Sequence, residues 1–132
     1  MFYMGPQYLA PAGSTGNNTH GSVQVQAAAQ LVIVKFDVEA VGGTPTVTWK
    51  VQGAVEQPEV SDANSNWFDM IYLTDATDTS AVAARTATAV GAQVQWLDVA
   101  SGARWYPKIR LVTSANTNVT YHAELFVAVH NN

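Results

Sequence analysis

Two pairs of residues in this sequence have the spacing that acid–base or metal chemistry needs. His122 and Glu124 are two residues apart, and so are Asp37 and Glu39, so each pair shares one face of a strand. His-x-Glu is half of a zinc-deaminase signature, whose other half needs cysteines, and the chain has none. A glycosidase places paired carboxylates in a sugar cleft. Because polar residues are ordinary on the solvated face of a sheet, we expect a polar stripe here.

A third candidate, residues 62–66 (Asp-Ala-Asn-Ser-Asn), begins like a calcium-binding loop. The glycine that an EF-hand needs next is Trp67, and the twelfth position is Leu73 instead of glutamate. We therefore expect a polar loop that precedes a strand. The sequence also has no Gly-x-Ser-x-Gly elbow and no phosphate-binding glycine loop. These observations predict a protein that is not an enzyme and that has no catalytic residues, cofactor or metal.

The stretch 104–110 (Arg-Trp-Tyr-Pro-Lys-Ile-Arg) contains three of the six basic residues of the chain, next to two aromatic rings. Cations beside flat rings bind single-stranded nucleic acid or acidic protein surfaces. The alternative is a strand that enters a sheet, with Lys108 and Arg110 pointing into solvent. The net charge of −4 argues against nucleic acid.

Tryptophans raise a further alternative, because aromatic rings stack on sugars in carbohydrate-binding modules. Trp49 alternates with polar residues on an inward face, so we expect it in the core. Trp67 and Trp105 each stand at the entry of an expected strand and are the plausible sugar platform.

The elements that must position these residues follow from composition and periodicity. A chain of 132 residues without cysteine fits one domain with no disulfide framework. Six basic residues are too few for a dedicated duplex-binding protein. The apolar run at 27–34 is too short to cross a bilayer, so we expect no membrane contact.

A period of two dominates from residue 23 onward, which indicates half-buried strands. Val47, Trp49 and Val51 alternate with polar residues, and the segment 119–129 shows the same alternation over its whole length. The turn at 42–45 (Gly-Gly-Thr-Pro) predicts a hairpin between 31–41 and 46–52. Further strands are expected at 23–27, 67–73, 93–99 and 106–113, with a loop and then a strand in 74–90 and a turn at 100–103.

About seven or eight strands predict an all-β fold, a single antiparallel β-sandwich with jelly-roll or immunoglobulin-like connectivity at 23–132. Residues 1–22 are rich in Gly, Pro, Ser and Asn, and no regular element fits them. We expect a flexible or extended N-terminal arm whose Phe2, Tyr3 and Tyr8 become ordered on binding a partner.

Four features together resemble small virion proteins of tailed bacteriophages, above all the head decoration (cement) proteins. They are the Gly/Pro-rich arm, the expected hairpin at 32–53, the strand at 67–69 (Trp-Phe-Asp) and the segment 106–111 (Tyr-Pro-Lys-Ile-Arg-Leu). The resemblance covers residues 30–129 and rests on strand types and turn residues. It implies a β-sandwich, often a homotrimer, that binds the major capsid protein on the outer surface of the capsid. Such a protein is made in the host cytoplasm and stabilises neighbouring coat subunits.

On this basis we expect a non-enzymatic virion structural protein. Phe2, Tyr3 and Tyr8 are the expected attachment residues, and Arg104, Lys108 and Arg110 are expected to contact an acidic coat surface. Two alternatives stay open: another head-fibre or tail-associated protein, and a carbohydrate-binding β-sandwich module.

Overall fold

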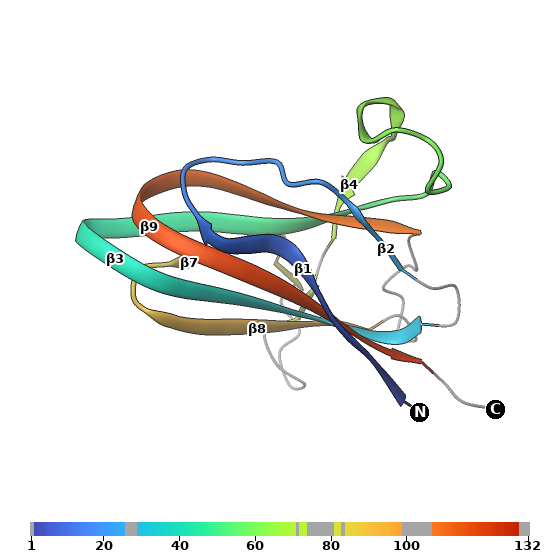
Figure 1. Cartoon of the computed structure of the whole chain (residues 1–132), viewed down its shortest axis with the longest axis horizontal. Helices are drawn as coiled ribbons and strands as arrows, with labels where there is room; N and C mark the ends of the chain where they lie inside the picture. Colours follow the sequence, from blue (N-terminus) through green and yellow to red (C-terminus); the bar gives the residue numbers. More distant parts are fainter. Residues whose placement is uncertain are drawn as a thin grey trace.

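The structure is a computed structural model that describes residues 2–25, 29–70, 72–73, 81–82, 84–98 and 107–129. Within these ranges the protein is all-β and antiparallel, as predicted, and hydrogen bonds join nine strands into one sheet (Figure 1). The described residues contain no helix that is both long and apolar enough to span a membrane. The elements are β1 Phe2–Ser14, β2 Val23–Gln24, β3 Ala29–Ala54, the 3-10 turn η1 Asp62–Asn64, β4 Trp67–Asp69, β5 Tyr72–Leu73, β6 Ala81–Val82, β7 Arg85–Ala87, β8 Gly91–Asp98 and β9 Lys108–Val129.

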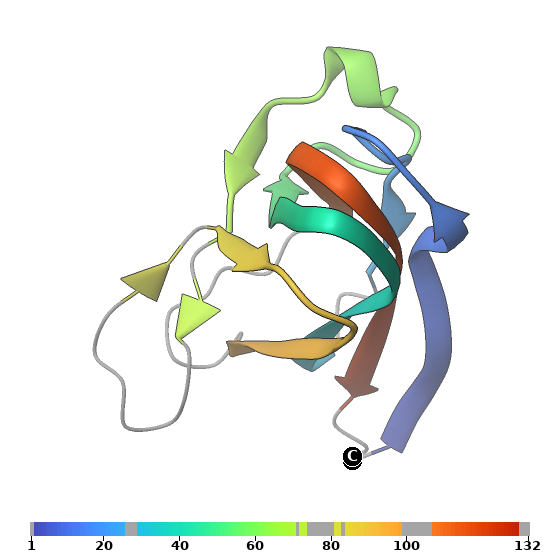
Figure 2. The ribbon, with the colours of Figure 1, turned by 90° about the vertical axis from the view of Figure 1, so that its left-hand side faces the viewer.

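The two long strands, β3 and β9, form an antiparallel ribbon that folds back on itself in the middle (Figures 1 and 2). The predicted hairpin at 42–45 is wrong, because the segments before and after this turn both pair with β9. Val41 lies opposite Val119 and Thr46 opposite Thr117, so four residues of β3 face the single residue Asn118 of β9. β3 runs along the outside of the bend, where it uses more residues than β9. The Gly-Gly-Thr-Pro segment is therefore a bend in the two-stranded ribbon and does not form a hairpin.

Residues with positive φ allow the ribbon to bend at this point. Gly43 has a φ of +59°, and across the ribbon Ala115 and Asn118 have φ values of +51° and +57°. Asparagine tolerates this left-handed conformation better than most residues, whereas alanine is strained there. Asn116 supports the turn, because its side chain accepts a hydrogen bond from the N–H of Val119 and donates one to the carbonyl of Val119.

The core lies between the two facing halves of the folded ribbon. Phe36 from the first half of β3 stacks on Trp49 from the second half, with ring centroids 5.0 Å apart and an angle of 7° between the rings. Phe36 also stacks on Tyr121 of β9. The alternation predicted for these strands is confirmed by the buried side chains Val32, Val34, Phe36, Val38, Val47, Trp49, Val51, Ile109, Leu111, Val119, Tyr121, Ala123, Leu125 and Val127. Burial of this one face decides which side of each strand points inward.

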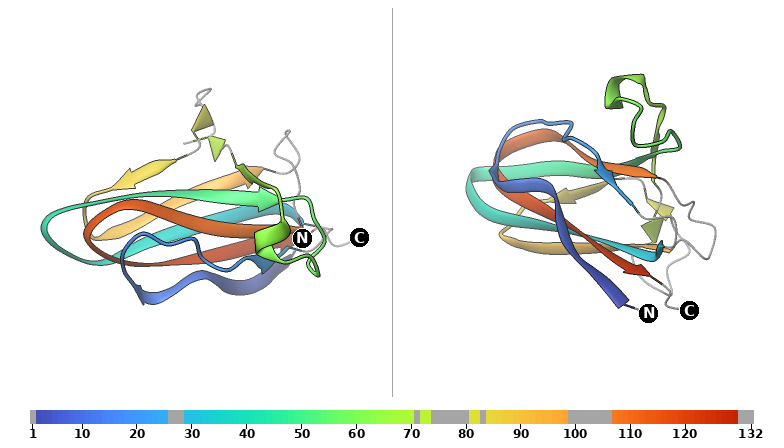
Figure 3. Two further views of the ribbon diagram at one scale, coloured as in Figure 1. Left: turned by 90° about the horizontal axis from the view of Figure 1, so that it is seen from above. Right: turned by 45° about the vertical axis from the view of Figure 1, so that its right-hand side comes forward.

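The N-terminal segment follows β9 along one edge of the sheet (Figure 3). β1 pairs with the C-terminal half of β9, from Phe2 opposite Val129 to Ser14 opposite Tyr121. Residues 18–25, called the strap below, lie beside the other half of β9 and include β2. The prediction that no regular element fits residues 1–22 therefore missed β1. Register shifts, with Pro6 and Pro11 within or beside them, hide the period of two, and an edge strand tolerates prolines.

The opposite side of the ribbon carries the shorter strands. β8 pairs with the first half of β3, whereas β7 and β4 pair with its second half. The strand expected at 67–73 is divided into β4 and β5, and the segment 74–90 contributes β6 and β7. The turn expected at 100–103 lies outside the described residues.

Candidate functional site

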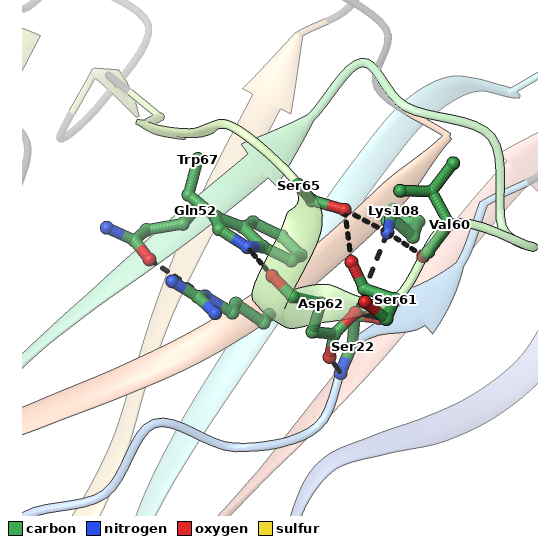
Figure 4. A network of polar contacts seen from close by, with 9 residues as sticks. Ser22, Gln52, Val60, Ser61, Asp62, Ser65, Trp67 and Lys108 are labelled. Atoms are coloured by element: carbon green, nitrogen blue, oxygen red, sulfur yellow. Dashed lines mark hydrogen bonds and ion pairs between the residues drawn. The ribbon is translucent and has the colours of Figure 1, made fainter.

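Lys108, at the start of β9, is buried under the loop that connects β3 to β4 (Figure 4). Its side chain was expected to point into solvent, and this prediction is wrong because the residue is only 2% exposed. The ammonium donates hydrogen bonds to the carbonyl of Val60, at 2.7 Å, and to the hydroxyl of Ser65. The Asp62 carboxylate lies 3.7 Å away. Because residues 55–66 fold over the sheet, Lys108, which was predicted to contact a partner, is buried within its own chain.

Ser65 beside Lys108 invites comparison with a serine–lysine catalytic pair, but the hydrogen bonds run in the other direction. The Ser65 hydroxyl donates to the carbonyl of Ser61 at 2.9 Å and accepts from Lys108. A catalytic lysine would instead accept the serine proton as a general base. The arrangement holds the 61–65 turn against the sheet.

Asp62 joins this loop to the strap. Its carboxylate accepts hydrogen bonds from the Ser22 N–H, at 3.0 Å, and from the Ser22 hydroxyl, at 2.6 Å. Burial raises the pKa of Asp62, but the Ser22 hydrogen bonds and the charges of Lys108 and Arg110 together bring it below its usual value. This hydrogen bonding agrees with the polar loop expected at 62–66. Among the described residues, no group of three or more His, Cys, Asp or Glu side chains could hold a metal ion.

Arg110 covers one face of the Trp67 ring, which the carbohydrate alternative uses as a sugar platform. Its guanidinium lies 3.9 Å from the centroid of Trp67, and its Nε donates to Gln52 at 2.9 Å. The Trp67 indole N–H donates to the carbonyl of Asp62 at 2.9 Å. Trp105, the other expected platform residue, lies outside the described residues.

A second polar cluster lies on the outer face of the other half of the ribbon, around His122. Its Nε2 is 3.5 Å from Asp37 and 3.4 Å from Glu124, and its Nδ1 is 3.7 Å from Glu39. The sequence identified both polar pairs, but it could not show that Asp37 lies directly opposite His122. Register between strands 85 positions apart in the chain brings the pairs together. Lys35 lies on the same face, with its ammonium 3.9 Å from Asp37, so three carboxylates against one lysine leave this face acidic.

β1 meets this acidic face at Tyr8. The Tyr8 side chain is 61% exposed, lies opposite Glu124 in the β1–β9 register, and approaches His122 edge-on with a centroid distance of 6.3 Å. Nearby, the N–H of Gly13 donates to Glu39 at 2.7 Å. Of the other expected attachment residues, Phe2 and Tyr3 belong to β1 but their side chains are not described, and Arg104 lies outside the described residues.

A shallow cavity of about 480 Å³ lies at the bend of the ribbon. Small and polar residues line it, among them Thr15, Gly42, Asn116, Asn118 and Thr120. The Asn116 amide already bonds to the carbonyls of Gly16 and Val119. The Asn116 side chain therefore stabilises the turn.

No protein-family model matches the chain, and no curated protein matches its sequence. Among solved structures, the fold is similar to that of the crystal structure of SPBc2 prophage-derived protein YomS, with a TM-score of 0.63 and 12% sequence identity. The similarity covers 97% of this chain and 96% of that chain. The chain shares its fold with a prophage-derived protein.

Proposed function

We propose that this protein is a non-enzymatic structural component of a phage virion, and that it decorates the outer surface of the capsid. The observation that carries the proposal is the whole-length fold similarity to a prophage-derived protein. In this role, the protein binds the major capsid protein as a homo-oligomer, a homotrimer on the family resemblance. It stabilises the assembled shell by mass action, because it binds the shell and not the dissociated coat subunits.

The attachment surface in this proposal is β1 together with the acidic face around His122. Among the described strands, β1 pairs with β9 alone, so its second edge is open to a partner strand. Tyr8 provides an exposed aromatic anchor beside the carboxylate of Glu124. A partner that covers Tyr8 therefore also meets negative charge, and it fits best if it presents Lys or Arg side chains there.

The basic residues take different places in the proposal. Lys108 is not part of the proposed contact surface, because it is buried and hydrogen-bonded within its own chain. Arg110 is partly exposed beside Trp67 and, with Arg104, stays a proposed contact to an acidic part of the coat. Phe2 and Tyr3 stay proposed attachment residues next to Tyr8.

Co-sedimentation with expanded, undecorated capsids of the source phage tests this proposal. We expect saturable binding at a fixed ratio to the coat subunit. Tyr8→Ala should weaken binding by at least about ten-fold, since truncation of an aromatic anchor costs about 1–2 kcal/mol or more. Val90→Ala is the matched control, because Val90 is 62% exposed but lies between β7 and β8.

Two results would count against the proposal. Capsids that bind other ligands but not this chain would point to a tail or head-fibre component. Equal loss of binding in Tyr8→Ala and Val90→Ala would exclude β1 as the attachment surface. Deletion experiments should remove only residues 2–12, because the strap beyond them is bonded into the sheet.

A further inference from the structure

Few of the described side chains of β1 reach the core. Of its described side chains, Leu9 and Ala10 are buried, whereas Pro6, Gln7, Tyr8, Pro11 and Ala12 are exposed. The methyl group of Ala10 adds little apolar area, so Leu9 is the main hydrophobic anchor. Three register shifts also interrupt the pairing of β1 with β9. The part of β1 whose side chains are described, from Pro6 onward, is thus held mostly by backbone hydrogen bonds at a sheet edge.

The end of β1 and the two residues after it are suited to act as a hinge. Residues 13–16, called the hinge below, contain Gly13 with a φ of +79° and Gly16 with a φ of +75°. No other atom lies within 4 Å of the position that a side chain would occupy at either glycine. Glycine changes its backbone angles at low steric cost. The Gly16 carbonyl accepts hydrogen bonds from Asn116 at 3.1 Å and Thr113 at 3.2 Å, whereas the Gly13 N–H donates to Glu39 at 2.7 Å. The path of the chain can therefore change at Gly13 once its hydrogen bond to Glu39 opens.

Beyond the hinge, the strap is fixed to the rest of the sheet. Asn18 makes two hydrogen bonds to Thr113: its N–H donates to the Thr113 hydroxyl at 3.0 Å, and its carbonyl accepts from the Thr113 N–H at 2.8 Å. The N–H of Val25 donates to the carbonyl of Pro107 at 2.9 Å. A loosely held terminal strand, a glycine hinge and a fixed strap therefore follow one another along the chain.

We propose that β1 exchanges between copies of this protein, with β1 of one copy pairing with β9 of a second copy. The second copy offers the same edge of β9, so the exchanged strand recovers every contact that it makes in its own chain. Exchange of an identical terminal element is a low-cost route to an oligomer. Tyr8 would then lie beside Glu124 of the neighbouring copy. The exchange concerns the purified protein alone and does not depend on capsid binding.

Disulfide trapping between two singly substituted chains tests the exchange, because the natural sequence has no cysteine. Tyr8 and Glu124 are direct partners in the register, close enough for a disulfide once both are cysteine. A tagged Tyr8→Cys chain is incubated with an untagged Glu124→Cys chain under mild oxidation. The matched control mixes Glu124→Cys with Lys35→Cys, since Lys35 is the other register partner of position 124 but belongs to the central strand β3.

The proposal predicts that the mixture of Tyr8→Cys and Glu124→Cys chains yields several-fold more mixed disulfide dimer than the mixture of Lys35→Cys and Glu124→Cys chains. Equal yields from the two mixtures would overturn it. A second mixture of Ala10→Cys and Ala123→Cys applies the same test with smaller changes, at positions that are both buried. A mixed disulfide there requires β1 of one chain to lie on β9 of the other, and its absence would also overturn the proposal.

Discussion

β1 and the strap pair with the same strand, β9, but they are held to it by different forces. The strap is held by backbone hydrogen bonds to β9 and to Pro107 before it, and by the side chains of Asn18 and His20, which bond to the hydroxyl of the completely buried Tyr121. Among the described side chains of β1, Leu9 is the main buried one, and the strand pairing around it is irregular. Two neighbouring segments of one edge thus differ in how easily they can leave it.

The difference follows from the cost of breaking each set of contacts. Tyr121 bonds to His20 at 2.8 Å, Thr113 at 2.9 Å and Asn18 at 3.3 Å, and separation of the strap would leave several of these polar groups without partners. Among the described side chains of β1, separation of the strand exposes only Leu9 and the small Ala10, and it returns the backbone groups to water. A segment can therefore be part of the sheet and still be available to a partner.

The largest expected effect comes from Tyr121→Phe, which removes the hydroxyl at the centre of the strap contacts. We expect the free energy of unfolding to fall by about 2–3 kcal/mol, because three polar side chains lose a partner. Tyr8→Phe is the matched control on β1, where the exposed ring predicts a change within about 0.5 kcal/mol. Urea denaturation measures both values. Similar losses in the two variants would remove the distinction between β1 and the strap.

The hinge gives the next largest effect. Gly13→Ala and Gly16→Ala place a side chain at positive φ, and each should cost about 1–2 kcal/mol of unfolding free energy or of β1 attachment. Gly21→Ala, within the strap, is the control, since its φ is not in the positive region and no atom crowds the position. Thermal unfolding of the three variants checks the ranking. A loss for Gly21→Ala as large as that for Gly13→Ala would contradict the assignment of the hinge.

A smaller effect is expected from acidification, through His20 of the strap. Burial lowers the pKa of His20 below its ordinary value of 6.5, so the unfolded chain binds the proton more readily than the folded one. The contribution of His20 to stability is therefore complete above pH 6.5 and declines as the pH falls below that value. Unfolding free energies measured from about pH 8 to about pH 5 should decline less in His20→Gln than in the natural protein. Identical pH profiles for the two proteins would show that protonation of His20 does not change the free energy of unfolding.

The faces of the long strands could be predicted from sequence, because burial of one side enforces a period of two. Phe36, Trp49 and Leu125 are buried as that period requires. β1 could not be predicted, since its prolines and register shifts remove the period. The bend at 42–45 has the composition of a hairpin turn, and only the pairing of both flanking segments with β9 distinguishes the two.

The candidate site was less predictable because it depends on contacts between distant segments. Burial of Lys108 requires the loop around Val60 to fold over it, which alternation along β9 does not reveal. The grouping of Asp37 with His122 depends on strand register. Tyr8 was identified correctly as an exposed aromatic residue, whereas its place in a paired strand was not.

Native-state hydrogen exchange tests the central claim, that β1 opens separately from the strap, most directly. The experiment compares the N–H groups of β1 that bond to β9 with those of Asn18, His20 and Val25 in the strap. We predict that the β1 amides exchange through a local opening with a lower free energy, whereas the strap amides approach the free energy of global unfolding. Equal opening free energies for the two groups would contradict this account.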